Sequence, residues 1–128
     1  MMKPWTHKTL NLPTTVQIAG VTFAIKFDEK MMETKKDPTH PTGFNARGNR
    51  GRFSHMDQSI YLWPGDDRYV PTSEHMRRVL WEELMHAILY VIHFESSDFV
   101  GQLYRNESFV GAIAELIYQV ENQLENND

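Results

Sequence analysis

The stretch Trp81-Glu82-Glu83-Leu84-Met85-His86 lies inside the longest periodic run of the sequence, which extends from about Thr72 to His93. At roughly 100° per residue, the apolar side chains of this run gather on one side of a helix and its titratable side chains on the other. The apolar set is Leu80, Trp81, Leu84, Ala87, Ile88, Val91 and Ile92, and the titratable set is His75, Glu82, Glu83, His86 and His93. The run therefore predicts an amphipathic helix with one face in the core and one face available for chemistry.

Strands are predicted ahead of this helix. The segments 16–18 and 21–27 place β-branched and aromatic residues on a two-residue period, which is typical of strands with one buried face. Ala19-Gly20 lies between them and supplies the glycine that a tight turn favours. Another strand is predicted from Ser59 to Trp63, where Pro64-Gly65 ends it.

A second helix is predicted after the first. Asn106 is a suitable N-cap residue, and the apolar side chains that follow it recur at helical spacing as far as Leu124. The order of elements predicts an α+β fold. We expect a small, mostly antiparallel sheet of about three or four strands from Val16 to Trp63, packed on a helix from Thr72 to His93 and a helix from Asn106 to Gln123.

Length and composition restrict the class of protein. The chain has 128 residues, of which 41% are hydrophobic, so it can bury the core of one domain. We expect residues 1–14 to form an N-terminal arm and residues 15–128 to form that domain. The formal net charge of −4 argues against nucleic acid as a partner. Because no apolar run approaches the roughly 18 residues that cross a bilayer, we expect a cytoplasmic protein with no membrane partner.

A basic segment that contains glycine lies between residues 45 and 52. Arg47, Arg50 and Arg52 alternate there with Gly48 and Gly51. The simplest interpretation is an exposed hairpin or loop with solvated arginines, and the alternative is a binding site for an anion, a nucleic acid or a partner protein.

The helix carries most of a zinc-hydrolase motif. A His-Glu-x-x-His site needs two ligands four residues apart on one helix face, and a glutamate beside the first ligand that activates the metal-bound water. Glu83 and His86 match the general base and the second ligand, but Glu82 occupies the place of the first histidine. Since the chain contains no cysteine, the candidate metal ligands are histidine and carboxylate side chains.

With the hairpin around Ala19-Gly20, the strand from Ser59 and the closing helix, this motif resembles the small zincin-like metallopeptidase-type proteins of phages and prophages. The resemblance covers roughly Val16 to Leu124, and the altered helical motif is its only specific part. It implies a short β-meander, then the motif helix, then a second helix. It also implies a third ligand at the start of that second helix, which by position is Glu107, with Glu115 as the alternative. A phage origin would place the protein in the cytoplasm of the host cell.

The altered residue leaves two possibilities for the metal. In one, Glu82, His86 and Glu107 bind Zn²⁺ and Glu83 acts as the base, and the two carboxylate ligands shift the preference toward harder ions such as Mn²⁺. In the other, the domain keeps the fold, has lost tight metal binding and needs no cofactor. His93 lies about 10 Å further along the helix than His86, too far to share an ion with it. His55 precedes a strand and can approach from another element, which the sequence cannot test.

Two classes of function follow from these alternatives. The first is a metal-dependent peptidase, a hydrolase of weak or lost activity, in which the altered Glu-Glu-x-x-His motif replaces the usual one. The second is a non-catalytic pseudo-enzyme that binds a host protein through the former active-site cleft or the basic segment 45–52. The substrate or partner and the oligomeric state are not determined by the sequence.

Overall fold

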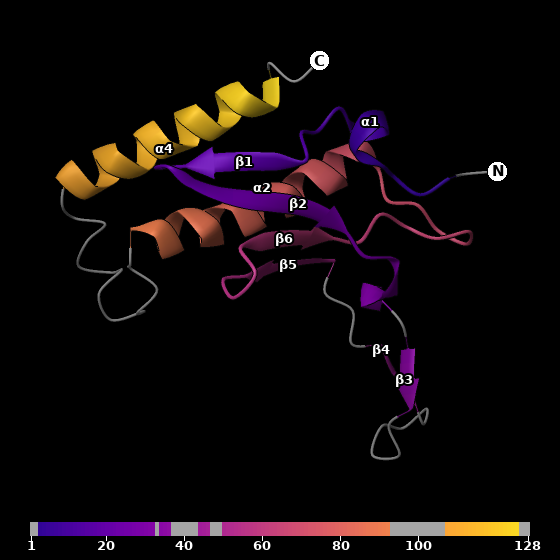
Figure 1. Cartoon of the computed structure of the whole chain (residues 1–128). Helices are drawn as coiled ribbons and strands as arrows, with labels where there is room; N and C mark the ends of the chain where they lie inside the picture. The colour runs from indigo at the N-terminus through magenta and orange to yellow at the C-terminus, as the bar shows by residue number, and fades with distance from the viewer. Residues whose placement is uncertain (1–2, 33, 37–43, 47–49, 93–106, 126–128) are drawn as a thin grey trace.

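The computed structural model describes residues 3–32, 34–36, 44–46, 50–92 and 107–125. Figure 1 shows the strands in front of one long helix, with a second long helix running beside β1. In chain order the elements are α1 (His7–Leu10), β1 (Thr15–Ile18), β2 (Val21–Phe27), the 3-10 helix η1 (Glu29–Met32), β3 (Thr34–Lys36), β4 (Phe44–Ala46), β5 (Gly51–Ser54), β6 (Ser59–Leu62), α2 (Ser73–Val91) and α4 (Glu107–Glu125).

The main sheet has four strands in the order β1-β2-β6-β5. The β1–β2 and β5–β6 pairs are antiparallel, whereas β2 and β6 are parallel, with Ala24 opposite Ser59 and Phe27 opposite Leu62. The predicted α+β fold, a mostly antiparallel sheet followed by two main helices, is therefore confirmed. Strands β3 and β4 form a separate antiparallel pair, which extends away from the main sheet in Figure 1.

The core lies between one face of the sheet and the two long helices. Alternate residues of the strands point into it, and α2 and α4 each contribute a stripe at helical spacing. The fully buried members of highest volume include Phe23, Ile25, Ile60 and Leu62 from the sheet, Leu80, Leu84 and Ile88 from α2, and Val120 from α4. The apolar residues whose spacing predicted the strands and helices are thus the residues that form the core.

The segment before β1 is tied to the body of the molecule. Leu10 and Leu12 are buried in the core cluster. The Trp5 indole Nε1 donates a hydrogen bond to the Pro71 carbonyl at 2.8 Å, and the Trp5 backbone N–H donates to the Pro64 carbonyl at 3.0 Å. The core therefore extends into residues ahead of the first strand.

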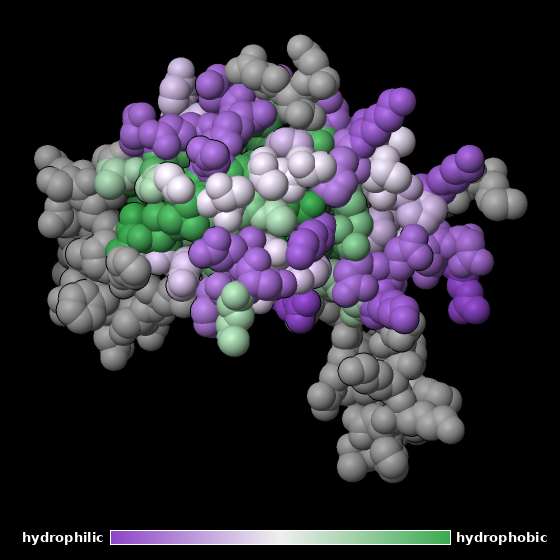
Figure 2. Space-filling view, in the orientation of Figure 1, coloured by the Kyte–Doolittle hydropathy of each residue, from purple (hydrophilic) through white to green (hydrophobic). Residues whose placement is uncertain are grey.

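The other face of the sheet is polar, and no helix in the described part of the chain packs on it. Its residues alternate with the core residues, and Thr22, Lys26 and Arg52 among them are exposed. Figure 2, drawn from this side, shows mainly hydrophilic and neutral side chains over the centre of the molecule. The described elements thus form two layers, and one face of the sheet carries no helix among them.

Two details of the predicted organisation are now placed. Gly51 and Arg52 belong to β5, which forms a hairpin with β6, and Arg52 is exposed as the hairpin interpretation expects, whereas Arg50 is half-buried. Glu83 does not lie on an exposed titratable face of α2, because β5 covers it. The described part of α2 ends at Val91 with Ile92 as its C-cap, and His93 lies outside the described residues.

Candidate functional site

The altered motif lies in the middle of α2, which begins as the sequence predicts. The Thr72 hydroxyl is the N-cap and accepts a hydrogen bond from the His75 backbone N–H at 3.1 Å. From there the apolar stripe holds α2 against β5 and β6. Glu82 and His86, four residues apart, project to solvent on the same side of this anchored helix.

Glu83 differs from its neighbours because it is buried, with 9% of its surface exposed. It lies under Gly51 of β5, and a Cβ atom at that glycine would come within 2.9 Å of the Glu83 Cγ and 3.2 Å of its Oε2. The same Cβ would come within 2.5 Å of the Val79 Cγ1. Glycine at position 51 is therefore what allows the strand to approach the carboxyl group so closely.

The position of Glu83 alters its acidity. Desolvation by burial raises the pKa of this carboxyl above its usual value of 4.5, the nearby His86 lowers it, and Glu82 raises it. Desolvation is the largest of the three effects, so the proton affinity of Glu83 exceeds that of an exposed glutamate. A buried titratable group of this kind beside exposed polar side chains is typical of functional sites.

Strand β5 is an edge strand and borders the site. In the described residues it pairs with β6 alone. The Trp63 backbone N–H donates to the Arg50 carbonyl at 2.9 Å, and hydrogen-bonded and non-hydrogen-bonded pairs alternate along an antiparallel ladder. It follows that Arg52 and Ser54 bond to β6, whereas the backbone N–H and C=O groups of Gly51 and Phe53 point away from the sheet. Among the described residues, a strand edge without a partner strand thus lies over Glu83.

The opposite edge of the sheet is closed by a side chain. Gln123 of α4 accepts a hydrogen bond from the Gln17 backbone N–H through Oε1 and donates one to the Gln17 carbonyl through Nε2, each at 2.8 Å. The amide group therefore takes the place that a neighbouring strand would occupy on β1. Within the part of the chain that the structure describes, no comparable side chain bonds to the outer edge of β5.

Aromatic residues extend the site beyond the motif. The Phe53 ring lies 5.8 Å from the Tyr90 ring, and the His55 ring lies 5.6 Å from it, measured between centroids. Tyr90 is four residues, or about one helical turn, beyond His86. The structure thus brings His55 to the motif side of α2, which the sequence left untested. His75 does not join the motif, because its Nε2 accepts a hydrogen bond from Arg50 at 3.0 Å.

The other predicted site residues are placed as follows. Glu107 is the first residue of α4, but its side chain lies outside the described residues, as does the whole of Arg47. Glu115, the alternative third ligand, is exposed and accepts a hydrogen bond from Gln119 at 3.5 Å. Arg52 lies against the Tyr61 ring on the sheet face opposite Glu83, whereas Arg50 lies against Trp63 and also reaches His75 of α2. Of the two described arginines, Arg52 is therefore separated from the motif by the strand.

The described histidine and carboxylate side chains supply part of a metal site. Glu82 and His86 leave one helix face four residues apart, as two ligands of one ion must. Among the side chains that the structure describes, no group of three histidine or carboxylate residues is close enough to hold an ion. A complete site thus needs a side chain outside that set, and Glu107 remains the predicted one.

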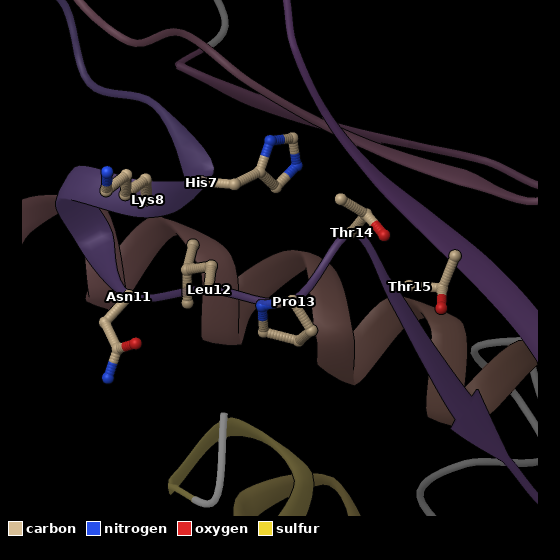
Figure 3. Close-up of a pocket in the computed structure, with 7 residues that line it drawn as sticks. All are labelled: His7, Lys8, Asn11, Leu12, Pro13, Thr14 and Thr15. Carbon is tan, nitrogen blue, oxygen red and sulfur yellow. The ribbon is translucent and has the colours of Figure 1, made fainter. Parts of the chain in front are cut away.

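Two cavities occur elsewhere on the described surface. One, of about 530 Å³, is formed by α1 and the segment that joins it to β1, as Figure 3 shows. The other, of about 320 Å³, lies between the end of α1, α2 and α4 and is lined in part by Trp81 and Glu121. Neither is lined by Glu82, Glu83 or His86, so neither belongs to the motif.

No protein-family model, curated protein or solved structure matches this chain. No helix in the described residues has the length and apolar character needed to cross a bilayer. The residues of α2 and β5 are therefore the features that indicate a function. Among these, sequence reasoning missed Gly51 and the free edge of β5, and an isolated glycine in a short strand was the one signal that could have indicated a close approach.

Proposed function

We propose that this chain is a zincin-like metallopeptidase-type domain with an altered motif, which is weakly active or inactive as a peptidase. The observation that carries the proposal is the burial of Glu83 beneath the free edge of β5. The Glu83 carboxyl, whose pKa is raised, lies there beside the outward-pointing backbone groups of Gly51 and Phe53. The helix that carries Glu83 also presents Glu82 and His86 to solvent.

The backbone groups favour a peptide as the ligand. An extended peptide can add a strand to an exposed sheet edge, because its own N–H and C=O groups complete the ladder. On β5 such a strand would bond to Gly51 and Phe53. One of its carbonyl groups would then lie beside Glu83, so that the edge strand, rather than side-chain contacts, would orient the bond to be cleaved.

In this proposal Glu83 accepts the proton of the attacking water. Its raised pKa makes it a stronger base than an exposed glutamate, and its carboxyl group lies against β5 at Gly51. Glu82, His86 and Glu107 would hold the ion, and Zn²⁺, or Mn²⁺ as the alternative, would polarise the peptide carbonyl and acidify the water. A pair of carboxylate ligands would weaken that acidification, which accounts for a low expected activity.

The metal and the base are tested together with the intact chain. We expect protein dialysed against Zn²⁺ or Mn²⁺ to hold close to one ion per chain, and to cleave an unstructured fluorogenic peptide slowly. Glu83→Gln should lose hydrolysis by a factor of about 10² or more while it retains the ion. Glu121→Gln, an exposed carboxylate of α4, is the matched control and should retain both properties.

A metal content well below one ion per chain would refute the peptidase form of the proposal. The second candidate is a non-catalytic module that holds a peptide or a segment of a host protein, and the free edge of β5 favours it equally. Peptide addition at β5 would shift the amide resonances of Gly51 and Phe53 more than those of Arg52 and Ser54, which bond to β6. Equal shifts at all four amides, or none, would contradict binding at this edge.

A further inference from the structure

The open face of the sheet carries a second feature, separate from Glu83. Strands β2, β6 and β5 place Lys26, Tyr61 and Arg52 in one row, because Tyr61 is opposite Lys26 in one ladder and opposite Arg52 in the other. The Lys26 Nζ lies 5.7 Å from the centre of the Tyr61 ring, and the Arg52 guanidinium carbon lies 4.5 Å from it. Two cations thus flank one aromatic ring on an exposed surface.

Near the start of β5, a third cation, Arg50, also lies against aromatic rings. The Arg50 guanidinium carbon lies 5.5 Å from the centre of the Tyr69 ring and 6.0 Å from that of the Trp63 ring. These two rings stack with an interplanar angle of 10°. Tyr69 remains 49% exposed, so its ring is accessible from solvent. The face therefore presents planar guanidinium and aromatic groups side by side.

A carboxylate lies beside this row. Asp57 accepts a hydrogen bond from the Tyr61 hydroxyl. Side-chain hydrogen bonds from Ser54 and Tyr61 lower the pKa of Asp57, and the charge of Lys26 helps to lower it. Lys26 and Arg52 against Asp57 leave the row with a positive charge, although the whole chain has a formal net charge of −4.

We propose that this face binds a single-stranded nucleic acid. Such a strand combines regularly spaced negative charges with flat bases, and the bases stack on aromatic side chains and on guanidinium planes. An acidic peptide would satisfy the cations but would leave the planar groups unused. Lys26, Tyr61 and Arg52 lie on the side of the sheet opposite α2, so this surface is separate from the peptide site at Glu83, while Arg50 reaches the start of α2 through His75.

The test uses the full chain and a labelled oligodeoxythymidine of about 12 nucleotides, with binding followed by fluorescence anisotropy at low salt. We expect binding that weakens with salt, with a slope of about −2 in log K against log salt concentration for three phosphate contacts. The double substitution of Lys26→Ala and Arg52→Ala should weaken binding at least tenfold and reduce that slope by about 1.4. Arg52→Lys keeps the charge and should retain the slope while losing affinity, because it removes a stacking plane.

The control is Arg78→Ala, which removes the same charge from an exposed position on α2, in the other layer. It should leave affinity and slope unchanged. Three results would overturn the proposal: no binding at low salt, an equal loss on Arg78→Ala, or equally tight binding of a polyglutamate peptide of the same length. The melting temperature of each variant separates loss of binding from loss of folding. Because Lys26, Arg52 and Arg78 are exposed, we expect their substitution to leave the melting temperature nearly unchanged.

Discussion

At the scale of single residues, Glu83 and Gly51 are the pair on which the candidate site depends. A carboxyl group under a strand is costly, because burial disfavours its charged form, and the raised pKa of Glu83 expresses that cost. Gly51 permits the contact, since any side chain there would overlap with Val79 and with Glu83 itself. A protein that needed stability alone would gain from an apolar residue at position 83.

The raised pKa of Glu83 predicts a dependence of stability on pH. The folded state binds the proton more tightly than the unfolded state, so Glu83 lowers the free energy of unfolding progressively as pH rises from the unfolded pKa through the folded one. Glu83→Gln removes this loss. The melting temperature of the variant relative to the natural chain should therefore increase between about pH 4 and pH 7.

Scanning calorimetry across that range checks the prediction, with Glu121→Gln as the control because its side chain is exposed on α4. A difference between Glu83→Gln and the natural chain that stays constant with pH would show that Glu83 ionises alike in the folded and unfolded states.

At the scale of elements, the two edges of the sheet are treated differently. The α4 helix occupies the backbone groups of Gln17 on the β1 edge through Gln123, which disfavours pairing of that edge with another strand. The β5 edge is short and lacks such a cover among the described residues. The same helix that contributes Val120 and Leu124 to the core thus also determines which edge remains available.

We predict that Gln123→Ala lowers the free energy of unfolding by about 1 kcal/mol, because two hydrogen bonds to Gln17 are lost while water and the better helix propensity of alanine offset part of the loss. Urea denaturation measures the change. The matched control is Gln119→Ala, which removes only a long hydrogen bond to Glu115 and should change stability by less than about 0.5 kcal/mol. Similar losses of stability in the two variants would mean that the two hydrogen bonds from Gln123 to Gln17 add no stability of their own.

At the scale of the whole molecule, the two-layer arrangement separates two surfaces of different chemistry. The helices and the core lie on one side, where β5 covers Glu83, and the polar face with Lys26 and Arg52 lies on the other. The segment before β1 closes one end of the core, since Leu10 and Leu12 are buried and Trp5 bonds to Pro71. Stability of the sheet and helices therefore involves residues that precede them.

Leu10→Ala tests how strongly that segment contributes. Leu10 is 3% exposed, so its truncation should cost about 2–4 kcal/mol in the free energy of unfolding. The neighbouring Lys8→Ala, at an exposed position of the same short helix, is the control and should cost less than about 0.5 kcal/mol. A loss below about 1 kcal/mol for Leu10→Ala would indicate that residues 3–13 form an arm that is energetically separate from the body.

The sequence by itself determined the elements and their class. Two-residue periods predicted β1, β2 and β6, and apolar stripes at helical spacing predicted α2 and α4, because these are local patterns that one buried face imposes on a strand or helix. The same patterns predicted the α+β order and placed Glu82, Glu83 and His86 on one helix.

Only the tertiary structure decided how these elements meet. The parallel pairing of β2 with β6, the approach of Gly51 to Glu83 and the row of Lys26, Tyr61 and Arg52 all join residues distant in sequence, and no local period encodes such contacts. Burial of Glu83 was mispredicted for the same reason: a helical wheel separates polar from apolar residues, but it does not contain the strand that covers them.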